Sequence, residues 1–178
     1  MSVTEVQPTH LLPVDTKGLA DLAEAGKQDP GKINTLAART VVDKRFRSLT
    51  YVRDLEPLVV DEPPHLLGDN TAPAPSEVVL SALGACLSVG IQANAADRGI
   101  ALTRIELELE GDINTTAVWG VGDLDDDKRL GFSAVRVKIN LEGDASDAEL
   151  DALVADADRW SPVGGTLRNP VNLTIAPV

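Results

Sequence analysis

Sulfur and aromatic side chains are scarce in this chain of 178 residues. It contains one cysteine, Cys86, and one methionine, and aromatic residues make up 3% of the sequence. A single cysteine excludes a disulfide within the chain and is typical of a protein from a reducing compartment. The chain is long enough to bury a sizeable core without disulfides or metal. We therefore expect a cytoplasmic protein with one main domain.

Positive charge is also in short supply. Sixteen Lys and Arg against 28 Asp and Glu give a net charge of −12, which disfavours nucleic acids and anionic membranes as partners. The N-terminus has no charged start followed by an apolar segment, so we expect no signal peptide. His10 and His65 have no further ligand at metal-binding spacing, and the acidic residues 123–127 do not fit a calcium loop. We expect no metal and no cofactor.

One long apolar stretch surrounds the cysteine. Three polar residues interrupt it between positions 78 and 93: Ser81, Ser88 and Gln92. A helix without a polar face is typically buried on all sides. Pro75 suits the first helical position, and Gly99 suits the left-handed residue after the last turn. The stretch predicts a buried helix over 75–98. Its apolar run is too short and too rich in Ala, Ser and Gly for a good membrane span.

Periodicity predicts the remaining elements. Residues 1–13 form a polar arm, and residues 160–165 are expected to break the helix before them. We interpret Asp61-Glu62-Pro63 as a strand end, since a residue before proline favours extended backbone. The predicted helices cover 15–28 and 147–158, and the predicted strands cover 35–42, 48–53, 58–60, 102–113, 132–141 and 171–175.

This order of elements, together with several short motifs, resembles the OsmC/Ohr family of hydroperoxide-reducing proteins. The motifs are Val60-Asp61-Glu62-Pro63, Leu67-Gly68, Pro75-Ser76-Glu77 and the run from Leu80 to Cys86. The resemblance covers residues 33–178 and leaves 1–32 as an N-terminal extension, an arm plus a short helix. It implies an α+β fold in which antiparallel sheets pack on a buried central helix. It also implies an intertwined homodimer with sites at the interface between the chains.

The chemistry of that family implies a set of site residues. A cysteine thiolate attacks the peroxide O–O bond, which gives Cys86 the catalytic role. The middle of a helix gains little from the helix dipole, so an arginine from elsewhere must stabilise the thiolate. The family's arginine corresponds to Arg45, with Arg47 as the alternative. Ser161 stands where the peroxidases have a second, resolving cysteine, and Ser76 stands where they have a glutamate that orients the arginine.

Two function hypotheses stay open. Both expect the site to be lined also by Glu77 and Trp160. Glu77 lies about 100° round the helix from Ser76, and Trp160 is next to Ser161 in the sequence. The first hypothesis is a one-cysteine peroxidase of oxidative-stress defence, which reduces an organic hydroperoxide and is regenerated by an external thiol. The second is a non-catalytic module that binds a hydrophobic small molecule in the interface pocket. A Cys86 that is alkylated readily near neutral pH favours the enzyme.

Overall fold

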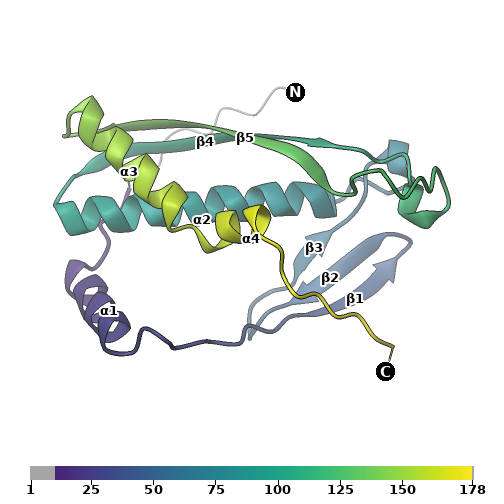
Figure 1. The fold of residues 1–178 in the computed structure, drawn as a ribbon, viewed down its shortest axis with the longest axis horizontal. Helices are drawn as coiled ribbons and strands as arrows, with labels where there is room; N and C mark the ends of the chain where they lie inside the picture. Colours follow the sequence, from purple (N-terminus) through teal and green to yellow (C-terminus); the bar gives the residue numbers. More distant parts are fainter. Residues whose placement is uncertain (1–10, 178) are drawn as a thin grey trace. The chain divides into compact units, whose positions relative to one another are not determined.

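The computed structural model describes residues 11–177, in which four α-helices and five strands form an α+β fold with two separate sheets (Figure 1). The described part of the chain forms two compact units. The first contains residues 11–28, 83–110 and 136–177, and the second contains residues 29–82 and 111–135. Two short 3₁₀ helices complete the element list: η1 (Pro64–Leu66) and η2 (Val118–Gly120). The first ten residues of the predicted arm, His10 included, lie outside the described residues.

The second unit holds a three-stranded antiparallel sheet. Its strands, in spatial order, are β1 (Arg39–Lys44), β2 (Arg47–Tyr51) and β3 (Leu58–Val60). Leu49 in β2 pairs with Val41 on one side and Val59 on the other. The prediction for β3 is confirmed, but the first strand begins at Arg39 rather than at residue 35. Arg39 pairs with Tyr51, the last residue of β2, so β2 offers no further residue to pair with the chain before Arg39.

The central helix α2 (Pro75–Arg98) has the predicted ends. Its C-terminus closes in the expected way. Gly99 has a φ of +70°, the amide of Ile100 donates to the carbonyl of Ala95 at 2.9 Å, and the amide of Gly99 donates to Ala96 at 3.2 Å. This is a Schellman motif, which satisfies two carbonyls of the last turn and needs a residue that tolerates positive φ.

Within the single chain, helix α2 is buried on one face. Its buried residues are Leu83, Leu87, Ile91 and Ala95, at a four-residue spacing, and Gly84 beside them. Val89, on another side of the helix, is 65% exposed. The chain's own elements therefore cover one stripe of the helix and leave other apolar side chains open.

The whole of α2 also meets the length criterion for a membrane span. With 24 residues and its apolar composition, it is long enough to cross a bilayer, and it is the one such helix among the described residues. The core helix of a soluble protein meets the same criterion. Length and composition alone thus do not decide between the two environments.

Two long strands form the second sheet. They are β4 (Leu102–Ile113), which has the predicted bounds, and β5 (Phe132–Gly143). Ion pairs join Arg104 to Glu142 and Arg136 to Glu110 across the strands, as an antiparallel pair requires. On β4 the apolar side chains alternate with exposed glutamates, which confirms the predicted half-buried strand.

Three further helices belong to the first unit: α1 (Thr16–Gln28), α3 (Asp147–Arg159) and α4 (Pro162–Arg168). Both longer helices start as predicted. The Asp15 carboxylate accepts the Gly18 amide at 3.0 Å, and Ser146 and Glu149 form a capping box before α3. Leu153 and Ala157 of α3 are buried, as its periodicity predicts.

At the C-terminus one prediction is confirmed and one was wrong. Helix α3 ends before residues 160–165, as predicted, with Trp160 as its C-cap, but a further helix that was not predicted, α4, begins at Pro162 with Ser161 as its N-cap. A proline after a serine marks a helix start as well as a helix stop. Residues 171–175 do not form a strand, although their apolar residues alternate. Leu173 and Ile175 are mostly exposed, so no neighbouring strand completes the pattern within the described chain.

Candidate functional site

Cys86 lies in the middle of α2, partly exposed, at the point where α3 passes close by. Gly90, one turn further on, makes this approach possible. A Cβ on Gly90 would lie 3.2 Å from the Cβ of Ala157 in α3. Because α3 runs so close to α2, the residues that follow its last turn emerge beside the thiol.

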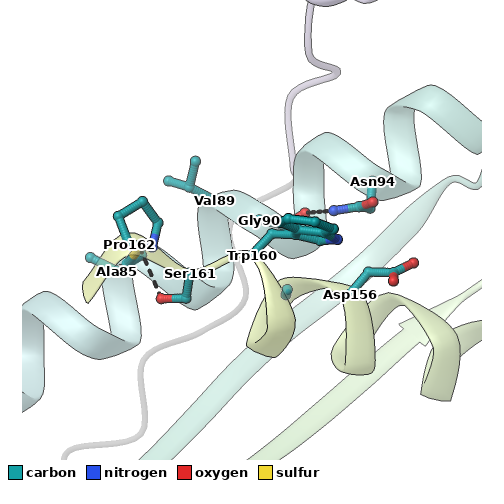
Figure 2. Close-up of a pocket in the computed structure, with 10 residues that line it drawn as sticks. Ala85, Val89, Gly90, Asn94, Asp156, Trp160, Ser161 and Pro162 are labelled. Atoms are coloured by element: carbon teal, nitrogen blue, oxygen red, sulfur yellow. Dashed lines mark hydrogen bonds between the residues drawn. The ribbon is translucent and has the colours of Figure 1, made fainter. Parts of the chain in front are cut away.

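Ser161 is the residue that meets the cysteine. Its Oγ donates to Cys86 Sγ at 3.2 Å and accepts the backbone amide of Gly164 at 3.0 Å. The side chain of Ser161 is 6% exposed. Figure 2 shows Ser161 and Pro162, at the start of α4, beside Ala85 of α2, with the hydrogen bond from the Ser161 hydroxyl drawn as a dashed line. The hydroxyl thus serves as the N-cap of α4 and as a direct partner of the sulfur.

A pocket of about 490 Å³ opens beside Cys86 (Figure 2). Its volume lies in the range of small-molecule sites. Its walls come from α2, α3 and the turn before α4, all within the first unit. The lining residues are Ala85, Cys86, Val89, Gly90, Asn94, Asp156, Ala157, Trp160, Ser161 and Pro162, which are mostly apolar.

The polar groups of the pocket are already engaged. Asp156 forms an ion pair with Arg98, and the Asn94 amide donates to the carbonyl of Gly90 at 2.8 Å. Trp160 is 69% exposed at the rim, with the guanidinium of Arg159 5.0 Å from its ring centroid. The pocket therefore offers apolar surface and one thiol to a ligand. The spacing of 86, 90 and 94 marks one helix face and is the sequence signal for Asn94, whereas no signal pointed to Asp156.

The structure brings three of the sequence-predicted site residues together: Cys86, Trp160 and Ser161. The other four belong to the second unit: Arg45, Arg47, Ser76 and Glu77. A place beside Cys86 stays a prediction for these four.

Within the second unit both arginines have carboxylate partners. Arg45, in the turn between β1 and β2 with a φ of +42°, donates to Asp69 at 2.7 Å. Arg47 forms an ion pair with Asp43. Glu77 accepts the amide of Ala74 at 2.7 Å and so caps the start of α2.

Two buried carboxyl groups follow β3, and sequence reasoning saw only a strand end there. Asp61 is 1% exposed, and its carboxylate accepts the amide and the hydroxyl of Thr71 at 3.0 and 2.8 Å. These bonds, led by the Thr71 amide, lower the pKa of Asp61 from 3.8 to about 2. The hydrogen bonds between Asp61 and Thr71 therefore stabilise the loop that leads from β3 to α2.

Glu62 is 8% exposed and behaves in the opposite way. Burial raises the pKa of Glu62, and the neighbouring charges of Asp61 and Glu77 raise it further. Among the described residues, no group of three His, Cys, Asp or Glu side chains is arranged to hold a metal ion.

Comparison with known proteins identifies the fold. The chain is similar to an OsmC-like protein from Mycoplasma pneumoniae, with 15% identity, a TM-score of 0.64, and coverage of 77% of this chain and 89% of that one. It is similar to an organic hydroperoxide resistance protein OsmC from Legionella pneumophila at 21% identity and a TM-score of 0.55, covering 77% and 91% of the two chains.

A third similar structure is a hydroperoxide resistance protein from Vibrio cholerae, described as holding captopril in one of its active sites. The identity is 18%, the TM-score is 0.56, and the match covers 80% and 91% of the two chains. A search of the curated proteins found no match. The family model described as OsmC-like protein matches residues 68–176, more than half of the chain. The α+β fold and the resemblance are thereby confirmed, and the chain belongs to the OsmC-like protein family.

Proposed function

We propose that this protein reduces organic hydroperoxides through Cys86 and is regenerated by an external thiol. The observation that carries the proposal is the position of Cys86. Its thiol sits in the wall of an apolar pocket and receives a hydrogen bond from Ser161. Family membership and the similarity to hydroperoxide resistance proteins from Legionella and Vibrio support hydroperoxide as the substrate class.

The reaction balances with one thiol in the protein and two outside it. The Cys86 thiolate attacks the terminal oxygen of the hydroperoxide, so an S–O bond forms and the O–O bond breaks. The alkoxide takes a proton and leaves as an alcohol, and the sulfur is oxidised to a sulfenic acid. One external thiol displaces water from the sulfenic acid and forms a mixed disulfide. A second releases the external disulfide and restores Cys86.

The composition of the pocket agrees with this substrate class. Val89, Pro162 and the ring of Trp160 supply apolar surface for the organic group of a hydroperoxide. Asp156, the charged residue in the lining, is neutralised by Arg98. A cytoplasmic location, which we propose from the single cysteine, provides small thiols as reductants.

The test is peroxide consumption by the purified full chain. Cumene hydroperoxide and hydrogen peroxide are each supplied with glutathione or with a small dithiol, and Cys86→Ser is the matched control. We expect the wild type to consume cumene hydroperoxide faster than the control and to prefer it over hydrogen peroxide. Equal rates for wild type and Cys86→Ser with every thiol would contradict the peroxidase proposal. The hypothesis of a non-catalytic binding module would then be favoured.

A further inference from the structure

The Ser161 hydroxyl has both of its roles set by geometry. A hydroxyl has one proton and two acceptor lone pairs. The Gly164 amide occupies one lone pair at 3.0 Å and so holds the side chain in one orientation. The proton then points to Cys86 Sγ at 3.2 Å. Since Ser161 is 6% exposed, bulk water has little access to compete for this bond.

Ionisation of Cys86 fixes the direction of this hydrogen bond. A neutral thiol can donate or accept, but a thiolate has no proton and only accepts. The direction of the bond is then fixed, with Ser161 as donor. A hydrogen bond to the charged form favours ionisation, and bonds to charged groups are stronger than neutral ones.

Two ion pairs lie within and between the helices that form the pocket and α4. Asp156 of α3 pairs with Arg98 of α2, and Asp158 of α3 pairs with Arg168 of α4 at 2.5 Å. The guanidinium of Arg159 lies over the Trp160 ring. In the described part of the first unit, the hydrogen-bond donor that reaches the sulfur is the uncharged hydroxyl of Ser161.

We propose that Ser161 is a positioning residue that stabilises the Cys86 thiolate through this hydrogen bond. Its importance for turnover rests on the proposed peroxidase function, but the bond itself is testable without peroxide. Ser161 thus has a role of its own at the position where related peroxidases have a second thiol.

The experiment measures the rate of Cys86 alkylation by iodoacetamide against pH. Ser161→Gly removes the hydroxyl but keeps a residue that is tolerated at a helix N-cap, so the start of α4 is little disturbed. We expect the midpoint of its profile to lie at a higher pH than that of wild type. Ser161→Thr keeps the hydroxyl and is expected to keep the wild-type midpoint.

Thr166→Ala controls for effects on the helix alone. Thr166 Oγ1 donates to the carbonyl of Pro162 at 3.0 Å, so this variant disturbs α4 without touching the Ser161 hydroxyl. Its alkylation profile is expected to match wild type. The proposal is wrong if Ser161→Gly has the wild-type midpoint, or if Thr166→Ala shifts the midpoint as far as Ser161→Gly does.

The two proposals fail separately. A shifted alkylation profile in a protein that consumes no hydroperoxide supports the role of Ser161 and refutes the peroxidase. Hydroperoxide consumption with an unshifted Ser161→Gly profile supports the peroxidase and refutes the role of Ser161. If both hold, the pH profile of hydroperoxide consumption by Ser161→Gly shifts in parallel with its alkylation profile.

Discussion

At the scale of single residues, the neighbours Asp61 and Glu62 carry the same functional group, but the fold lowers the pKa of one and raises the pKa of the other. Both are buried, but three hydrogen bonds reach the carboxylate of Asp61, from Thr71 and from the Glu62 amide. Glu62 faces negative charge from Asp61 and Glu77. Folding therefore favours the ionised form of Asp61 and the protonated form of Glu62.

The two groups should change the free energy of unfolding with pH in opposite directions. The pKa of Asp61 falls from 3.8 to about 2 on folding, so its contribution is present above about pH 4 and is lost as pH falls towards 2. Asp61→Asn should therefore be less stable than wild type at neutral pH, with a gap that closes in acid.

The pKa of Glu62 is raised from 4.5, so its contribution is present below that value and is lost as pH rises through the folded pKa. Glu62→Gln should match or exceed wild-type stability at neutral pH and lose that advantage in acid. Urea unfolding between about pH 3 and pH 7 measures both gaps. A Glu62→Gln protein that is less stable than wild type at neutral pH would show that the ionised Glu62 has a stabilising partner.

The arginine expected beside Cys86 is tested with a matched pair of variants. Arg45→Met should raise the midpoint of the Cys86 alkylation profile, because a nearby cation stabilises a thiolate. Arg47→Met should leave the midpoint unchanged. A shift in Arg47→Met alone would place the family's arginine one strand alternation further on. No shift in either variant would mean that neither arginine serves the thiol.

A cysteine at position 161 should restore a resolving thiol. Ser161 Oγ lies 3.2 Å from Cys86 Sγ, so Ser161→Cys places two sulfurs close together. One equivalent of organic hydroperoxide should then give an intrachain disulfide, which requires Cα atoms within about 7 Å. Mass spectrometry should show the loss of two hydrogens and a cross-linked peptide. A Cys86 sulfinic acid without a cross-link would contradict the prediction.

At the scale of elements, local signals predicted the boundaries well. Pro75 and Gly99 mark both ends of α2, and the alternation of leucine and glutamate predicts β4 to the residue. These features depend on neighbours within a few positions. Helix α4 escaped prediction because Gly164 and Gly165 lower helix propensity, and the Ser161-Pro162 start was interpreted as a stop.

Features that depend on distant partners were harder to predict. The alternation at residues 171–175 predicts a strand, but a strand forms only beside another. The four-residue stripe of buried positions on α2 depends on where α3 and β4 pack. The approach of Ser161 to Cys86, 75 residues apart, has no sequence signal of its own and was reached through the family resemblance alone.

The buried stripe of α2 predicts which side chains stabilise the helix. Ile91 is fully buried, so Ile91→Ala should lower the free energy of unfolding by about 2–5 kcal/mol. Val89→Ala, two residues away, should cost less than Ile91→Ala, because Val89 is 65% exposed within its own chain. Urea unfolding measures both values. Equal losses in the two variants would show that Val89 is covered as fully as Ile91 in solution.

At the scale of the whole molecule, the uncovered apolar side chains of α2 suggest a second chain. Val79 and Val89 are exposed on this helix, and so are the alternating apolar residues of 171–175. Apolar surface of this kind marks an interface in a soluble protein. We therefore expect a homodimer, and light scattering at micromolar concentration should give twice the chain mass of 18.8 kDa. A mass of one chain would contradict this expectation.

The predicted division at residue 32 remains a prediction. Helix α1 has no buried residue, and the OsmC-like match begins at residue 68, beyond the proposed extension. Both observations are compatible with a body that does not depend on its first 32 residues.

The shared hydroxyl of Ser161 also limits how this site can change over time. One side chain starts α4 and contacts the sulfur of Cys86, so each substitution at this position changes the helix start and the surroundings of the thiol together. Glycine retains the first property and loses the second, alanine loses both, and threonine retains both. Of these residues, only a hydroxyl-bearing one keeps both the start of α4 and the contact with the sulfur.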